Sequence, residues 1–319
     1  MKKFIKKIII FMILNIVLVF GILFVVIKLI PPQFSNLYQA EIGNKIERLN
    51  NITGQKIIYV TGSSGAFCVD SKKISEELNI EFVNLGLHAG FGNRFVDEIA
   101  KDAVNEGDIV ILAHEFDTYY SDYNEATGGI SLLATSINDN LSYLKYFSNV
   151  QKKQFINYLP AYIFTKLDKF FKITVEEEVV PYFASAFNEY GDIYYELPYL
   201  EGNVFYHYVN NYKDSFNDST INGTKEFVDY AKERGAYVVF NFPFMRIEDN
   251  YNIDYKQVKK SEAKILSLLD LEALYPIEKS FKEKVYFFDT ANHCNVDGKN
   301  EYTDLILNSL REYIEENDL

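Results

Sequence analysis

Two short segments near opposite ends of the chain carry side chains that together could perform acyl transfer. Residues 62–65 read Gly-Ser-Ser-Gly, and residues 289–293 read Asp-Thr-Ala-Asn-His. A serine hydroxyl becomes nucleophilic when an adjacent base takes its proton, and that base needs a third group to fix its tautomer. We therefore predict that Ser63 is the nucleophile, His293 the base and Asp289 the acid that orients the base.

A third segment supplies groups that could assist this chemistry. Residues 84–86 read Asn-Leu-Gly, and glycine lets a backbone amide come close to a developing oxyanion. We predict the Gly86 amide as an oxyanion donor, and His88 in the same loop as a substrate contact. The four histidines show no metal-ligand spacing such as His-Glu-x-x-His, so we expect neither a metal nor another cofactor.

Alternating strands and helices are expected to bring these segments together. Short apolar runs predict five strands, at residues 56–60, 80–85, 108–113, 236–242 and 285–289. Helical spacing or amphipathic pattern predicts helices at residues 71–78, 95–104, 223–234, 257–274 and 296–315. Such alternation is typical of a parallel sheet with helices on both faces, where ligands bind at the carboxyl ends of the strands.

The stretch at about residues 115–220 lacks this alternation of strands and helices and is rich in aromatic residues. We predict a largely helical insertion there, with helices at about residues 132–147 and 150–171, that shapes or caps the cleft. The α/β domain as a whole is expected to span residues 55–319.

The N-terminus predicts a membrane anchor. Four lysines precede an apolar run from residue 8 to residue 30, which is interrupted only by Asn15 and Lys28. About 20 apolar residues suffice to cross a bilayer as a helix, and the positive-inside rule keeps the lysines cytoplasmic. A cleaved signal peptide is the alternative, but no small-x-small site follows the run. We expect residues 1–30 to be a single-pass anchor, residues 31–54 a polar, partly helical stalk and the remainder extracytoplasmic.

Charge and cysteine content restrict the function further. The five lysines of the first 30 residues leave 27 basic against all 45 acidic residues, which gives the remainder a formal charge of −18. Such a surface repels nucleic acid, so nucleic-acid binding is not expected. Two cysteines, Cys68 and Cys294, are too few for a disulfide framework.

Three blocks resemble the SGNH (GDSL-like) hydrolase superfamily, in particular bacterial membrane-anchored members found with cell-envelope polysaccharide O-acylation systems. They are residues 61–70 (TGSSGAFCVD), 83–90 (VNLGLHAG) and 287–298 (FFDTANHCNVDG). The resemblance covers about residues 55–115 and 220–315. It implies a flavodoxin-like three-layer sandwich with about five parallel strands.

The resemblance also implies residue roles. Aligning Phe67 and Asp70 with the family pattern makes Ser63 the nucleophile, whereas reading residues 62–64 as Gly-x-Ser makes it Ser64. In the family pattern, the amides of Ser63 and Gly86 are the oxyanion donors. The family geometry would also place Cys68 and Cys294 near the cleft, where we favour two buried thiols over a disulfide.

One block departs from the family pattern. Most members of this superfamily carry Gly-x-Asn-Asp after the third strand, and the asparagine of that motif completes their oxyanion hole. Here residues 113–117 read Ala-His-Glu-Phe-Asp. Asn241 is a candidate substitute in the cleft, and Glu115 is expected to pack or bind substrate there.

Three functions follow from these observations. The first is an O-acetyltransferase acting on a cell-envelope glycan, with a polytopic membrane O-acyltransferase as the partner that supplies the acyl group. The second is a carbohydrate esterase with the same triad. The third is a non-catalytic accessory or binding protein on an SGNH-like fold, which the missing asparagine favours.

Overall fold

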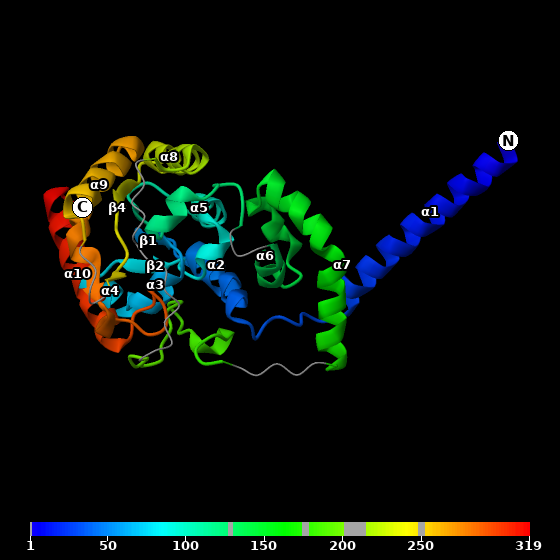
Figure 1. Ribbon diagram of the computed structural model, residues 1–319, viewed down its shortest axis with the longest axis horizontal. Coiled ribbons are helices and arrows are strands. Elements are labelled where there is room, and N and C mark those ends of the chain that lie inside the picture. Colours follow the sequence, from blue (N-terminus) through cyan, green and yellow to red (C-terminus); the bar gives the residue numbers. More distant parts are fainter. Residues whose placement is uncertain (1, 127–129, 174–178, 201–214, 248–252) are drawn as a thin grey trace.

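Helix α1 (Lys2–Phe24) projects from the rest of the molecule as a long apolar rod (Figure 1). This computed structural model describes residues 2–126, 130–173, 179–200, 215–247 and 253–319. Together with the π-helical segment Val25–Leu29, α1 forms a 28-residue helix whose most apolar window has a mean hydropathy of 3.2 and contains no buried residue. The prediction of an N-terminal helix long and apolar enough to span a membrane is confirmed, and its orientation stays a prediction.

A four-stranded parallel sheet forms the centre of the globular part, in the order β2-β1-β3-β4. Its strands are β1 (Lys56–Thr61), β2 (Glu81–Asn84), β3 (Ile109–Ala113) and β4 (Tyr237–Phe240). Every residue of β1 and β3 is buried, as expected for strands covered on both faces. The predicted mixed α/β architecture with a parallel sheet is confirmed.

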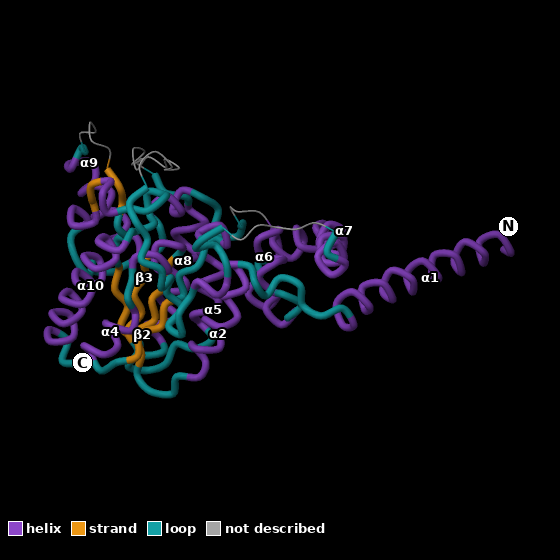
Figure 2. The backbone as a smooth tube through the Cα atoms, turned by 90° about the horizontal axis from the view of Figure 1, so that it is seen from below, coloured by secondary structure: helices purple, strands orange, loops and turns teal. Residues whose placement is uncertain are grey.

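Helices cover both faces of this sheet (Figure 2). They are α3 (Ser63–Cys68), α4 (Ser71–Leu78), α5 (Asn93–Lys101), α8 (Asp218–Glu233), α9 (Tyr255–Leu269) and α10 (Val296–Glu316). The chain crosses the sheet in one direction from β1 to β2, and in the opposite direction from β2 to β3 and from β3 to β4. Because parallel crossovers are right-handed, α3 and α4 lie on one face, and α5 and α8 on the other. Helix α10 packs against α3 and α4.

The predicted fifth strand at residues 285–289 is wrong. Residues Lys284–Tyr286 form a 3₁₀ turn, and Phe287 pairs with Cys294 in an antiparallel bridge within its own loop. The outer edge of β4 is instead occupied by residues 272–274, which exchange backbone hydrogen bonds with Phe240. A separate pair of short parallel strands, β5 (Met245–Ile247) and β6 (Phe281–Glu283), lies outside the main sheet.

Residues 34–49 of the predicted polar, partly helical stalk are helical in part, but they pack onto the domain instead of forming a free spacer. They form a 3₁₀ turn (Tyr38–Glu41) and helix α2 (Ile42–Asn51). Phe34, Ile42 and Leu49 are each at most 1% exposed and belong to the core. Apolar residues at helical spacing give α2 one apolar face, and burying this face against the domain stabilises the helix. The anchor therefore joins the domain with almost no free spacer.

The insertion contains helices α6 (Ile130–Ile137) and α7 (Asn149–Phe171), with shorter 3₁₀ turns between and after them. The helix predicted at residues 132–147 is confirmed only in part, because it ends near residue 137 and residues 141–146 form a 3₁₀ turn. Helices α6 and α7 pack against each other on the side of the globular part that faces α1 (Figures 1 and 2).

Candidate active site

The turn between β1 and α3 separates the two adjacent serines. Strand β1 ends at Thr61, and α3 begins at Ser63 with Gly62 as its N-cap. Ser63 is half-buried, whereas Ser64 is completely buried. Only Ser63 is therefore accessible to a substrate.

The structure brings Ser63, His293 and Asp289 together in a hydrogen-bonded chain. The Ser63 hydroxyl lies 2.9 Å from His293 Nε2, and His293 Nδ1 lies 2.8 Å from Asp289 Oδ1. If Nδ1 donates to the carboxylate, Nε2 is left as an acceptor for the serine proton. This is the arrangement that a serine nucleophile, its base and an orienting acid require.

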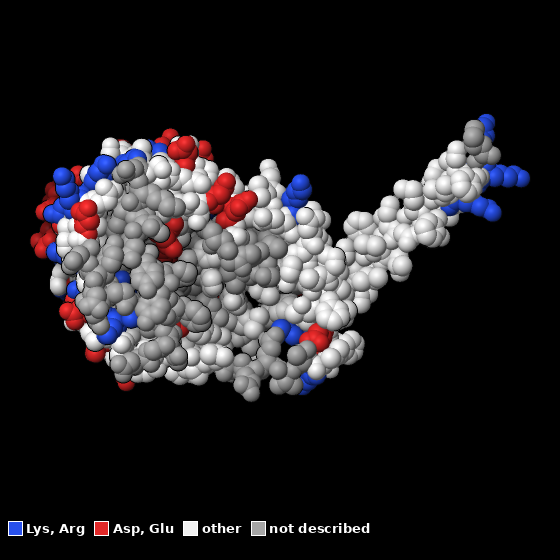
Figure 3. Space-filling view, in the orientation of Figure 1, with Lys and Arg blue, Asp and Glu red and all other residues white. Residues whose placement is uncertain are grey.

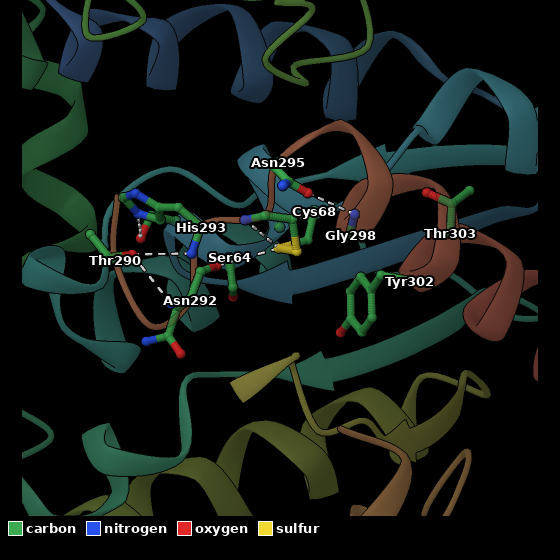
Figure 4. The surroundings of a disulfide bond; sticks show 12 residues. Ser64, Cys68, Thr290, Asn292, His293, Asn295, Gly298, Tyr302 and Thr303 are labelled. Atoms are coloured by element: carbon green, nitrogen blue, oxygen red, sulfur yellow. Dashed lines mark hydrogen bonds between the residues drawn. A yellow bond between two sulfur atoms is a disulfide. The ribbon is translucent and has the colours of Figure 1, made fainter. Parts of the chain in front are cut away.

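Surrounding groups fix the His293 ring. Phe67 of α3 stacks on it with a centroid separation of 3.8 Å and an interplanar angle of 3°. Thr290 Oγ1 accepts the backbone amide of His293 at 3.0 Å and stabilises the loop that carries the ring (Figure 4). The ring is thus held by packing on one side and by its own loop on the other.

Tyr182, which comes from the insertion, also belongs to this site. Its hydroxyl donates to Asp289 Oδ2 and lies 3.1 Å from His293 Nδ1. Burial pulls the pKa of Asp289 upward, but hydrogen bonds from His293 and Tyr182 outweigh burial and hold that pKa below its ordinary value. Sequence reasoning missed Tyr182 because a lone tyrosine in an aromatic-rich insertion carries no distinguishing signal.

Replacing Tyr182 with phenylalanine is expected to destabilise the fold at neutral pH by about 1–3 kcal/mol, because a hydrogen bond to a charged group is lost. The pKa of Asp289 should rise toward its ordinary value. A carboxyl with a depressed folded-state pKa stabilises the fold above its unfolded pKa and loses that contribution as pH falls through the folded pKa. The stability deficit of Tyr182→Phe should therefore be present at neutral pH and shrink in acid. Thermal unfolding from pH 7 to pH 3 measures this, and a deficit that grows in acid would contradict it.

Glu115 holds the buried serine rather than facing the cleft. Its Oε1 accepts the Ser64 amide at 3.0 Å and the Ser64 hydroxyl at 2.8 Å. Glu115 is 3% exposed, and its Oε2 has no hydrogen-bond partner among the described residues. The carboxylate lies so close to Gly62 that a Cβ there would be 2.0 Å from Oε2. Glu115 therefore positions the turn that presents Ser63.

Gly62→Ala should consequently destabilise the fold by about 1–3 kcal/mol, because the added methyl would displace a buried carboxylate whose Oε1 accepts hydrogen bonds from Ser64. Backbone strain plays no part, since Gly62 has a φ of −90°. Gly54→Ala is the matched control, because nothing lies within 4 Å of its new Cβ. Thermal unfolding of both variants tests this, and equal stabilities would contradict the close packing of Glu115 on the turn.

A disulfide joins the two halves of the site (Figure 4). Cys68 at the end of α3 is bonded to Cys294, the residue after His293, across 226 positions of sequence. The prediction of two buried thiols is therefore wrong. The reason is that the antiparallel bridge between Phe287 and Cys294 turns the loop back against α3 and brings the two Cα atoms within 4.9 Å.

The predicted oxyanion donors differ in their surroundings. The Ser63 amide belongs to the first turn of α3, where amides have no carbonyl partner within the helix. The Gly86 amide instead donates to Asn84 Oδ1 at 2.9 Å. The Asn84 side chain is itself held by the carbonyl of Gly65 and by Asp192, each at 2.8 Å. The structure thus commits the Gly86 amide to an internal contact.

The predicted substrate contacts Asn241 and His88 lie in different surroundings. Asn241 is fully buried, and its amide donates to the hydroxyls of Tyr59 at 3.0 Å and Tyr302 at 2.8 Å. It cannot donate to an oxyanion while both hydrogens are used. His88 is half-buried and its Nδ1 accepts the Gly90 amide at 2.9 Å, while burial first and the neighbouring His293 second lower its pKa.

Comparisons with known protein families and curated proteins found no match. Within the described ranges, no group of three or more histidine, cysteine, aspartate and glutamate side chains is placed to hold a metal ion.

Proposed function

We propose that the protein is a membrane-tethered serine acyl-transfer enzyme with an SGNH-like fold. The observation that carries this proposal is the hydrogen-bonded chain from Ser63 through His293 to Asp289. The order of its parts supports the SGNH assignment: the serine follows the first strand, and the acid and base precede the last helix. A half-buried serine beside a fully buried one also favours Ser63 as the nucleophile.

The proposed reaction proceeds through an acyl-enzyme. His293 Nε2 takes the Ser63 proton as Oγ attacks the carbonyl carbon of an acyl ester, and the Ser63 amide stabilises the oxyanion that forms. The protonated His293, stabilised by Asp289 and Tyr182, then gives its proton to the departing alcohol. In the second half, His293 deprotonates the acceptor hydroxyl as its oxygen attacks the Ser63 ester. His293 then returns this proton to Ser63 Oγ as the ester bond to the serine breaks.

The proposed acceptor is a hydroxyl of a cell-envelope glycan, the acyl group is acetyl, and the acyl donor is a polytopic membrane O-acyltransferase. The apolar helix α1 and its near-direct junction with the domain support this choice, because both would hold the site close to a membrane. The Cys68–Cys294 disulfide supports an extracytoplasmic location, since disulfides persist mainly in oxidising compartments. With water as acceptor, the same site would be an esterase.

A non-catalytic binding role is the second candidate, and one observation favours it. The Gly86 amide and both Asn241 amide hydrogens are engaged within the protein, so the Ser63 amide is the remaining predicted oxyanion donor. Loss of one such donor typically reduces kcat by about 10²–10³. A site with a single donor would therefore be slow.

Labelling of the full chain with a fluorophosphonate probe distinguishes these candidates. We expect the wild-type protein to be labelled and His293→Ala to resist labelling at the same pH. An unlabelled wild-type protein would favour the binding role. Incubation with p-nitrophenyl acetate and an envelope oligosaccharide then separates the two enzymes, because a transferase yields acetylated sugar whereas an esterase yields only acetate.

A further inference from the structure

Helix α7 exposes a stripe of large apolar side chains along one face. Ile156, Phe164 and Phe171 are 64%, 73% and 65% exposed, and the exposed Pro160 lies between the first two. Positions spaced by 4, 4 and 7 residues project from the same side of a helix. Contiguous exposed apolar surface of this kind marks a contact with another protein or with a membrane.

The opposite face of α7 is the one that packs into the domain. Phe155, Tyr162 and Lys166 are at most 5% exposed, and α7 contacts α6. In Figures 1 and 2, α6 lies between α7 and the central sheet, whereas α1 leaves on the other side of α7. The apolar stripe therefore looks away from the sheet, toward the side from which α1 projects.

Direct contacts place α7 beside the end of α1. The ammonium group of Lys166 donates to the carbonyl of Ile30 at 2.9 Å, and Phe34 packs against Tyr162 with ring centroids 5.5 Å apart. Helix α7 also contacts the π-helical segment Val25–Leu29 that ends the apolar helix. The uncharged surface of α1 continues onto this part of the molecule in Figure 3.

The charges of α7 differ from those of the surrounding chain. The helix carries four lysines and one aspartate, although the chain as a whole is acidic. Lys152 and Lys153 near its start, and Lys172 just after its end, are exposed. Apolar residues on one face with lysines around them are typical of helices that lie in a membrane interface, where lysine ammonium groups reach the headgroups.

We propose that the apolar stripe of α7 (Ile156, Pro160, Phe164 and Phe171) is inserted into the lipid leaflet from which α1 emerges. The proposal rests on α1 spanning the bilayer, and it adds a second contact of different geometry. One helix alone leaves the domain free to swing about its junction. A second helix lying in the interface fixes which side of the domain faces the lipid, and so the orientation of the Ser63 site.

Tryptophan fluorescence tests this directly, because the chain contains no tryptophan. The full chain with Phe164→Trp is reconstituted into phosphatidylcholine vesicles with and without brominated acyl chains, which quench only indole in contact with lipid. We expect a blue-shifted emission that brominated lipid quenches. Bromine in both leaflets makes the result independent of the direction of insertion. Phe20→Trp in α1 is the positive control, and Tyr255→Trp in α9, which is 46% exposed, is the solvent control.

The outcomes separate the two claims. Quenching of Phe20→Trp without quenching of Phe164→Trp would overturn the contact of α7 with lipid while leaving the anchor in place. A blue-shifted but unquenched Phe164→Trp would mean that protein, such as a second copy of the chain, covers the stripe, which also overturns the proposal. An unquenched Phe20→Trp would overturn both the anchor and the contact that rests on it.

Discussion

Ser63→Ala is expected to abolish fluorophosphonate labelling and to reduce acyl transfer by about 10⁴-fold or more, whereas Ser64→Ala should still be labelled. The reason is the position of the two hydroxyls. Ser63 Oγ lies 2.9 Å from His293 Nε2, whereas Ser64 Oγ donates to Glu115 at 2.8 Å in a fully buried site. A hydroxyl without a base and without access to substrate cannot act as the nucleophile.

The stabilities of the two variants should show the opposite order. Ser63→Ala removes a half-buried hydroxyl and should change the unfolding free energy little. Ser64→Ala leaves the buried Glu115 carboxylate with one donor fewer, which should cost about 1–3 kcal/mol. Thermal unfolding and probe labelling of the same preparations give both results. Loss of labelling in Ser64→Ala alone, with Ser63→Ala still labelled, would reverse the assignment of the nucleophile.

Local sequence patterns predicted the elements that present the site. The apolar run at residues 56–60 indicated a strand, and β1 occupies it. Residues 62–65 were predicted as a tight loop, but only Gly62 lies outside α3, which already begins at Ser63. Helix α4 begins and ends at the predicted residues, and α10 differs from its predicted bounds by one residue. These segments were predictable because their apolar spacing matches the surface that they bury.

Features that depend on contacts between distant segments were not predictable. Residues 285–289 have the composition of a buried strand, but residues 272–274 already occupy the edge of β4, and the disulfide of Cys294 holds the loop that follows against α3. Residues 31–54 were predicted as a polar stalk, and nothing in that segment indicated that the domain would cover α2. Tyr182 reaches Asp289 across 107 positions, a distance at which no local pattern carries information.

The Cys68–Cys294 disulfide is expected to contribute about 2–5 kcal/mol to stability, because its loop spans most of the domain. Cys68→Ala/Cys294→Ala should therefore unfold at a clearly lower temperature than the oxidised wild type. The double variant is preferable to single ones, since it leaves no free thiol to pair wrongly. Alkylation under denaturing conditions provides the chemical check. The wild type should react at no cysteine before reduction and at two after it.

Activity should fall in the double variant even where it remains folded. Cys68 ends the helix that begins at Ser63, and Cys294 directly follows His293, so the bond fixes the separation of the proposed nucleophile and base. Catalytic groups must be held within about 0.5 Å of productive geometry. Because both cysteines are at most 1% exposed, reductant added to the folded wild type should act slowly, and the variant is the sharper test. If the double variant retains wild-type activity at a temperature where it is fully folded, the bond stabilises the domain without positioning Ser63 and His293.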